Sequence, residues 1–305
     1  MLAFLVRHSP VLMLVFYALG FCLPDAAAWL LPYLPSILFF LMCFSLIGIN
    51  QRQLLQTLTQ RGIWLFAAAH VGASCLLMLG VAWLCGIRGD LLIAIAAVGA
   101  TAPLFATGAL VQSVGLDPLP AMARTIAATL LMPLVLWILL QWSDGARLDL
   151  VAYVQKLLIY IAGPIVLSVI LRATLPEHWL RRIYPRVAQF AVILVFAFPF
   201  GLTTAFRHLY DQQGASGALY LMGISFLLCF GGFALAWFLY RQRGTDDAIA
   251  AAMVGGSRNV LLTLTITSPF LGNTFLALIG ALQLPVFAMP IVAKALIKRL
   301  REKHA

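Results

Sequence analysis

Long apolar segments, separated by short polar connections, fill almost the whole chain of 305 residues. Hydrophobic residues make up 63% of the chain and charged residues only 10%. A soluble domain has roughly 25% charged residues, and it needs far more polar surface than this chain supplies. The composition therefore excludes a soluble enzyme and predicts a membrane protein. One span takes about 20 apolar residues, so the length allows roughly ten spans and no sizeable soluble domain.

The apolar segments predict an all-α fold with ten membrane-spanning helices. They are continuously apolar and rich in leucine and alanine, whereas the strands of a membrane barrel would be short and alternating. No small-residue cleavage site follows the N-terminal residues, so we expect these residues to be retained rather than removed as a signal peptide. The predicted spans are about 9–23, 30–49, 63–86, 91–114, 119–141, 151–171, 187–206, 217–240, 247–271 and 274–297.

The 20 lysines and arginines predict the orientation. With the N-terminus inside, fourteen of them lie in cytoplasmic segments and four in outer loops. Cytoplasmic loops carry such an excess, so we expect both termini in the cytoplasm and a bacterial inner (plasma) membrane location. The net charge of +10 then reflects topology and contact with the lipid bilayer, not nucleic-acid binding. Two arginines remain within predicted spans: Arg124, expected to snorkel to the headgroups, and Arg258.

An internal repeat divides the ten spans into two halves of five. Halves with an odd number of spans must insert with opposite orientations, so we expect inverted repeats over 1–141 and 142–305. Inverted repeats are typical of secondary transporters. The alternative is coincidence between helices of similar composition. At a constant offset of 157 residues the matches are Asp90 with Asp247, Gly99 with Gly256, and Met132-Pro133 with Met289-Pro290.

The fourth and ninth predicted spans are both interrupted. Pro103 has no N–H to donate, and its ring clashes with the preceding helical turn. In the ninth span, Gly255-Gly256 is followed by three polar residues near mid-membrane. Unwound backbone is tolerated at this depth only where it faces a cavity or packed protein. We therefore expect the two broken helices to cross and to form one midplane site, whose half-helix N-termini favour an anion.

Arg258 is the main candidate for substrate binding. A guanidinium at the membrane centre keeps its charge and must face water, a partner or an anionic ligand. No acidic residue lies in a predicted span core, which favours an external anion, although a structural pairing is the alternative. The other predicted substrate contacts belong to the same interruptions, and for the polar side chains among them local backbone bonding is the alternative: Asn259, Ser257, Thr101, Pro103, Thr107 and Thr263.

Three further residues are candidates for an ion site. Thr125 and Thr129 share one helical face, where hydroxyls either bond to the backbone or line an ion site. His70 is a packed interhelical histidine, a site residue or a proton carrier. The five cysteines are scattered singly, so neither a disulfide nor a metal site is expected. Phosphate-loop, GxSxG and HExxH motifs are missing, so we expect no ATP-driven transport and no enzyme.

These features resemble the bile acid:sodium symporter family. The resemblance rests on Pro103 followed by Thr125-Ile-Ala-Ala-Thr129-Leu-Leu-Met-Pro133, on Gly256-Ser-Arg-Asn259-Val-Leu-Leu, and on the ten-span plan. It implies a panel domain of spans 1, 2, 6 and 7, and a core domain of spans 3–5 and 8–10. It also implies sodium-driven secondary transport, by alternating access, of small organic anions such as bile acids, steroid conjugates or carboxylates.

The chain departs from that family where the family's sodium sites would lie. A Ser-Asn pair is replaced by Gly108-Ala109, a glutamate by Val254 and a glutamine by Arg258. Sodium prefers several oxygen ligands with a carboxylate nearby, so we expect weak or absent sodium coupling, with Arg258 as a fixed positive charge. No other cofactor is expected. A non-transporting receptor or sensor, or a channel, on the same fold is the alternative, and the oligomeric state is left open.

Overall fold

The computed structural model describes residues 8–142, 149–267 and 270–304, and the secondary structure within these ranges is entirely helical. The expected all-α fold is therefore confirmed for the described part of the chain. Seven helical stretches are long and apolar enough to cross a membrane, as expected of an integral multi-pass membrane protein. These stretches are Pro24–Ile47, Arg61–Leu84, Pro118–Trp142, Leu150–Thr174, His178–Arg243, Thr245–Thr267 and Gly272–Arg299.

Several of these stretches are built from consecutive helices. In the N-terminal half the helices are α2 (Ser9–Cys22), α3 (Pro24–Leu30), η1 (Leu31–Tyr33), α4 (Leu34–Ile47), α5 (Gln51–Leu58), α6 (Arg61–Ala68), η2 (Ala69–Ala73), α7 (Ser74–Leu84), α8 (Gly89–Ala100), α9 (Thr107–Ser113) and α10 (Pro118–Trp142). In the C-terminal half they are α11 (Leu150–Leu157), η3 (Leu158–Ala162), α12 (Gly163–Thr174), α13 (Glu177–Val195), α14 (Ala197–Gly201), α15 (Thr203–Tyr240), η4 (Arg241–Arg243), α16 (Thr245–Gly256), α17 (Val260–Thr267) and α18 (Gly272–His304).

The two predicted interruptions are present. The helix expected over 91–114 ends at Ala100 and resumes at Thr107, with Pro103 in the non-helical segment between α8 and α9. The helix expected over 247–271 ends at Gly256 and resumes at Val260. Thr101 and Ser257, the first residues after α8 and α16, are both extended, with ψ angles of 134° and 145°. Each apolar segment is thus divided into two half-helices.

Some helix boundaries differ from the expected spans. α2 has only 14 residues, which is short for a complete crossing. The segments expected at 187–206 and 217–240 lie within one helical stretch of 66 residues, His178–Arg243. Within α15, Gly214 has a φ of 68°, a value that favours glycine, and this bends the chain between two helical parts. The polar helix α5 was not expected, because its residues are not apolar enough for a span.

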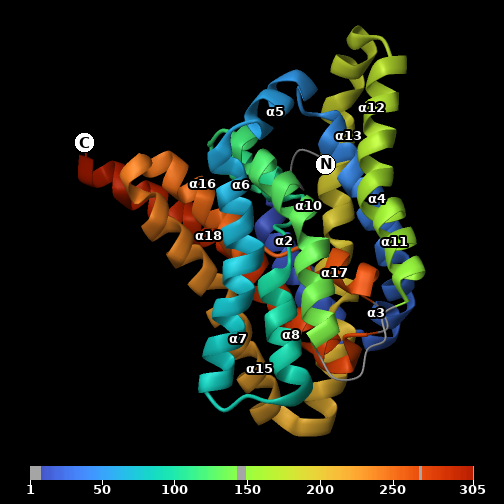
Figure 1. Ribbon diagram of the computed structural model, residues 1–305, viewed down its shortest axis with the longest axis vertical. Helices are drawn as coiled ribbons and strands as arrows, with labels where there is room; N and C mark the ends of the chain where they lie inside the picture. The colour runs from blue at the N-terminus through green and yellow to red at the C-terminus, as the bar shows by residue number, and fades with distance from the viewer. Residues whose placement is uncertain (1–7, 143–148, 268–269, 305) are drawn as a thin grey trace.

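The helices form two neighbouring groups (Figure 1). One contains α4, α11, α12 and α13, and the other contains α6, α7, α8, α15, α16 and α18. Within the second group α8 packs on α7, while α16 and α18 pack on α15. Glycines allow these close approaches: a Cβ on Gly99 would lie 2.8 Å from the Cα of Cys75, and a Cβ on Gly255 would lie 2.9 Å from the carbonyl oxygen of Gly232. The interrupted helices are therefore tightly packed.

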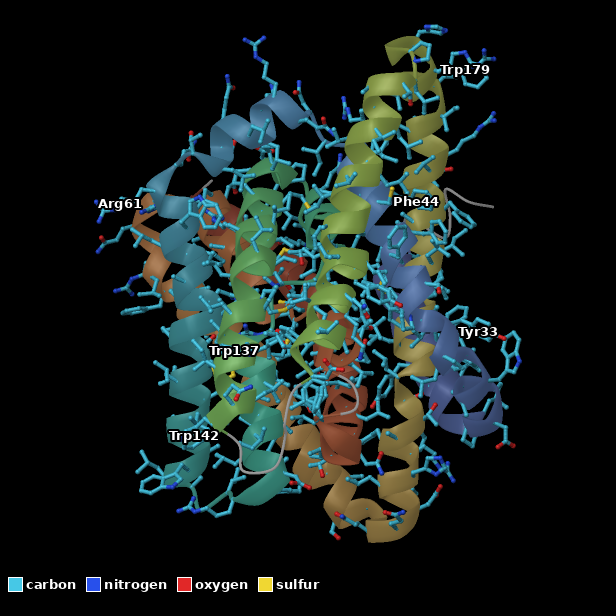
Figure 2. All side chains as sticks on the ribbon, turned by 45° about the vertical axis from the view of Figure 1, so that its right-hand side comes forward. Tyr33, Phe44, Arg61, Trp137, Trp142 and Trp179 are labelled. Atoms are coloured by element: carbon cyan, nitrogen blue, oxygen red, sulfur yellow. The ribbon has the colours of Figure 1, made fainter. Side chains whose placement is uncertain are left out.

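Large apolar side chains cover much of the outer surface. Leu84 is 77% exposed, Leu76 71% and Trp29 69%, although each lies on an apolar helix. Tyr33, Trp142 and Trp179 also project away from the bundle (Figure 2) and are exposed. Tyr and Trp are enriched where a membrane meets water. The outside of the molecule is therefore suited to contact with lipid.

Candidate functional site: the meeting point of two interrupted helices

The two interruptions lie directly against each other. The backbone N–H of Asn259 donates a hydrogen bond of 2.7 Å to the carbonyl of Ala102. Two buried pairs of hydroxyls make further direct links. Thr101 and Thr263 are 2.9 Å apart, and Thr107 and Ser257 are also 2.9 Å apart. Together with the contact between Arg258 Nη1 and the Thr101 carbonyl, these bonds bring together six of the seven predicted substrate residues, all but Pro103.

Arg258 lies at this meeting point and is only 2% exposed. Its Nη1 faces four acceptors: His70 Nε2 at 2.8 Å, and the carbonyl oxygens of Thr101 at 3.2 Å, His70 at 3.3 Å and Gly99 at 3.4 Å. Nη2 lies 3.3 Å from the Ser74 hydroxyl. Because Nη1 carries two hydrogens, it has more acceptors around it than it can bond linearly. This arrangement is similar to an oxygen-rich cage around a cation.

The charge of Arg258 is balanced by dipoles rather than by a carboxylate. Each acceptor found around it among the described residues is uncharged, and two of the carbonyls, those of Gly99 and Thr101, lie at the C-terminal end of α8. A helix C-terminus carries a partial negative charge and stabilises a cation. This differs from the expectation that half-helix N-termini would dominate the site. The helix terminus that the Arg258 guanidinium contacts is the carbonyl end of α8.

His70 is a direct partner of Arg258. It lies in η2, a turn of π-helix between α6 and α7, and it is 6% exposed. Since arginine only donates, the Nε2 atom of His70 must accept, and the imidazole is neutral with its proton on Nδ1. The lone pair that would bind an ion is therefore already used. Ser74, which sequence reasoning missed, anchors the same turn, because its hydroxyl donates to the His70 carbonyl at 2.6 Å.

Two donors at the meeting point have no partner among the described residues. They are Arg258 Nε and Asn259 Nδ2, and both are buried. Asn259 uses its Oδ1 to accept from the N–H of Leu262 at 3.4 Å, which caps the start of α17 and leaves its two amide hydrogens free. Unpaired buried donors are uncommon in proteins and cost free energy. Two of them on consecutive residues, beside a buried positive charge, are suited to an anionic acceptor.

Thr125 and Thr129 lie on α10 and are buried. Each hydroxyl donates to the carbonyl four residues earlier, Thr125 to Ala121 at 2.9 Å and Thr129 to Thr125 at 2.8 Å. This is the backbone bonding that helical threonines commonly adopt. Among the described residues, no group of three His, Cys, Asp or Glu side chains is arranged to hold a metal ion.

The expectation that Arg124 snorkels to the headgroups is wrong. Arg124 is 5% exposed, and its Nη2 lies 2.6 Å from Oδ1 of Asp247 on α16. Its guanidinium also lies over the rings of Phe66, at 5.5 Å, and Tyr240, at 4.9 Å. A partner 123 residues away along the chain cannot be recognised from the local pattern of α10. The start of α16 supplies the carboxylate that keeps this charge inside the protein.

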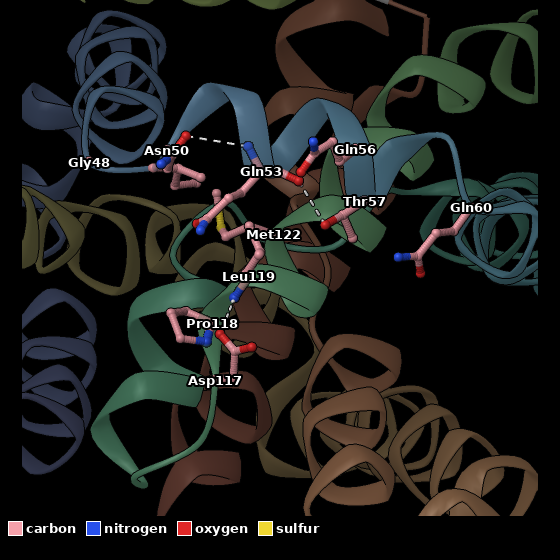
Figure 3. Close-up of a pocket in the computed structure, with 11 residues that line it drawn as sticks. Gly48, Asn50, Gln53, Gln56, Thr57, Gln60, Asp117, Pro118, Leu119 and Met122 are labelled. Carbon is pink, nitrogen blue, oxygen red and sulfur yellow. Dashed lines mark hydrogen bonds between the residues drawn. The ribbon is translucent and has the colours of Figure 1, made fainter.

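A cavity of about 600 Å³ lies between α5 and the start of α10. About half of its wall is polar, supplied by neutral amides, the Thr57 hydroxyl and the Asp117 carboxylate. Figure 3 shows side chains of α5 facing Asp117 and the start of α10 across it. Asn50 caps α5 by accepting from the N–H groups of Arg52 and Gln53. None of the predicted site residues lines the cavity. The lining residues are Gly48, Ile49, Asn50, Gln53, Gln56, Thr57, Gln60, Asp117, Pro118, Leu119 and Met122.

The sequence did not predict this cavity, because all the candidate site residues were chosen from the apolar spans. The available signal was the run of amide side chains between the second and third predicted spans, Asn50 to Gln60, which is too polar for the membrane core. Met122 lines the cavity and is 3% exposed. Its sulfur would lie 2.5 Å from a Cβ on Gly108, the residue after Thr107.

No known family model matches the chain, and comparison with curated proteins found no significant relative.

Proposed function

We propose that this protein is a secondary transporter of small organic anions, such as carboxylates or steroid conjugates, that works by alternating access. The observation that carries the proposal is the buried positive charge of Arg258 beside two unpaired donors, where two interrupted helices meet. The anion would bind at Arg258 Nε and Asn259 Nδ2, with the hydroxyls of the two interruptions nearby. Broken helices that meet at mid-membrane are a common way for transporters to bind a charged solute.

The packing around the interruptions supports two inverted repeats. α8 and α16 each have 12 residues, and each ends at a helix break. A Cβ on Gly99 would collide with the backbone of Cys75 on α7, and a Cβ on Gly256 would lie 2.9 Å from the Cys229 carbonyl on α15. The two glycines are 157 residues apart and the two cysteines 154. At the repeat offset of 157 residues the counterpart of Cys75 is Gly232, about one helical turn from Cys229, so the two glycines meet neighbouring positions of their partner helices. This near match supports repeats over 1–141 and 142–305.

The ten-span topology is part of the same proposal. The seven long apolar stretches become ten crossings when three features are considered together. α2 is a short span, α8 and α9 are the halves of a broken one, and the stretch His178–Arg243 holds two spans that separate near Gly214. Spans 1, 2, 6 and 7 then form the panel domain and the others the core. The basic residues favour cytoplasmic termini and a bacterial inner membrane.

The surroundings of Arg258 also support transport without sodium. Its Nη1 occupies the place among the carbonyls of Gly99, Thr101 and His70 where a bound cation would find oxygen ligands. A guanidinium is tethered and keeps its proton, so it supplies the positive charge permanently. Among the positions that match the family's sodium ligands, Thr125 and Thr129 keep their hydroxyls, but Val254 and Gly108 offer no side-chain oxygen. We infer that the fixed charge replaces a co-transported sodium ion.

Two measurements test the proposal. A thermal-stability screen of the purified protein against steroid conjugates, carboxylates and sulfonates should find an anion that raises the melting temperature, because a ligand at 100 times its Kd stabilises by about 2.7 kcal/mol. Proteoliposomes should then take up that anion with saturable kinetics, equally well with and without a sodium gradient. Strong sodium dependence would disprove the tethered-cation role. Binding without flux would indicate a receptor, and non-saturable flux a channel.

A further inference from the structure

The cavity between α5 and α10 comes close to the meeting point of the interrupted helices without reaching it. Its lining includes Met122 but none of Thr101, Thr107, Ser257 or Arg258. These four residues are at most 2% exposed, so they are closed off from the cavity. Arg52 lies in the first turn of α5 and Arg61 begins α6, which places the cavity on the side that the basic residues assign to the cytoplasm.

Met122 is the side chain that separates the two. It contributes to the cavity wall, and its Sδ and Cγ atoms lie 2.5 and 2.6 Å from the position that a Cβ on Gly108 would take. The thioether therefore lies directly over the backbone of Gly108. The adjacent residue, Thr107, forms the hydroxyl pair with Ser257 at 2.9 Å. The Met122 side chain thus lies between the cavity and the Thr107–Ser257 pair.

The chemistry of Met122 and Gly108 suits a movable barrier. Methionine is unbranched and has three rotatable side-chain bonds, so it can change rotamer without movement of the backbone. Gly108 has no side chain, which lets the thioether lie against its Cα. A larger residue at position 108 would have to displace the Met122 side chain.

We propose that Met122 is the cytoplasmic gate of the substrate site, and that its side chain swings away from Gly108 to connect the cavity with the Thr107–Ser257 pair. The proposal rests on the transport function proposed above, and it names the residue that controls access to that site. Because Met122 both lines the cavity and lies against Gly108, the cavity is the cytoplasmic entrance to the substrate site. The amides of α5 can hydrogen-bond a passing solute, and the charged residue in the lining is the acidic Asp117, so an anion would not be held there by charge.

The test measures access to a reporter thiol at position 107 in the full-length purified protein. Thr107→Cys is combined with Met122→Ala, and the rate of modification by a small methanethiosulfonate is followed by mass spectrometry of the peptide, which separates the reporter from the native cysteines. We expect the modification rate of the reporter to rise about tenfold or more with Met122→Ala. This variant removes the side chain that would otherwise have to move before the reagent reaches position 107. Met122→Val, which loses less buried volume, should give a smaller rise.

Met42→Ala is the matched control, since Met42 is also a fully buried methionine but lies on α4 and does not line the cavity. We expect it to leave the reporter rate unchanged. An equal rise with Met42→Ala would show that the protein loosens generally. No rise with either Met122 variant would show that another residue blocks the path to position 107. Either result would overturn the proposal that Met122 is the gate. The assay uses no substrate. A failed uptake experiment with normal reporter behaviour would therefore contradict only the proposed function.

Discussion

Arg124 and Asp247 form an ion pair of 2.6 Å that joins α10 to α16 inside the protein. The arginine side chain is 6% exposed and the aspartate side chain 31%. Asp247 is thus the carboxylate that neutralises one of the two arginines found within predicted spans, whereas Arg258 has only uncharged acceptors among the described residues. The two buried arginines therefore have different roles, one in holding helices together and the other in the candidate site.

Asp247→Asn should destabilise the protein, because it leaves the Arg124 guanidinium buried without a counter-charge. Removal of one partner of a fully buried pair costs about 3–5 kcal/mol, and partial exposure of Asp247 reduces the expected loss to about 1–3 kcal/mol. Thermal unfolding in detergent measures the change. The exposed pair Arg207–Asp211 supplies the control, and Asp211→Asn should leave the melting temperature nearly unchanged. Equal losses in the two variants would contradict the structural role of Arg124.

Arg258→Gln removes the positive charge while its amide still donates to the surrounding carbonyls. We expect the stabilisation by the anion found in the screen to disappear, with an affinity loss of at least about tenfold, the equivalent of 1.4 kcal/mol. The unliganded variant should remain folded. The measurement is the melting temperature at increasing anion concentration, with Asp211→Asn again as a control away from the site. An unchanged affinity would remove Arg258 from substrate binding and leave it a purely structural group.

Gly99→Ala should force α7 and α8 apart. Its Cβ would lie 2.8 Å from the Cα of Cys75 and 2.9 Å from the Ser74 carbonyl, and neither backbone atom can move alone. Overpacking of this kind costs about 1–3 kcal/mol. Gly72→Ala is the matched control in the helix segment η2, because nothing lies within 4 Å of its Cβ position. Alanine there should be neutral or stabilising by up to about 1 kcal/mol. Similar melting temperatures for both variants would argue against the close packing.

Thr101 and Thr263 provide a test of the contact between the two interruptions. Valine at either position keeps the shape and removes the hydroxyl that spans the 2.9 Å between them. A double-mutant cycle should give a coupling energy of about 0.5–1.5 kcal/mol, as for one buried hydrogen bond. The cycle of Thr125 and Thr263, which make no hydrogen bond with each other, should give a coupling near zero. Equal coupling in both cycles would mean that the two interruptions are not joined through the hydroxyls.

The helix breaks were predictable because their causes are local. Pro103 cannot complete a helical turn, and Gly255-Gly256 adds two flexible residues before Ser257. The partners of the buried arginines were not, because they depend on how distant helices pack. His70 reaches Arg258 across 188 residues of sequence. Hydropathy also directs attention to the membrane core, and it therefore passes over the polar helix α5 and its cavity.

The tethered cation has a consequence for the energetics of the proposed cycle. A sodium symporter releases its positive charge with the substrate, but Arg258 stays in the carrier. The empty carrier then has one more positive charge at the site than a carrier loaded with a monovalent anion. If the site moves through the membrane field, voltage acts on the empty carrier rather than on the loaded one, with about 2.3 kcal/mol per charge for each 100 mV. Each turnover would then carry one negative charge across the membrane, so the membrane potential would affect the rate of return and, together with the substrate gradient, set the direction of net flux.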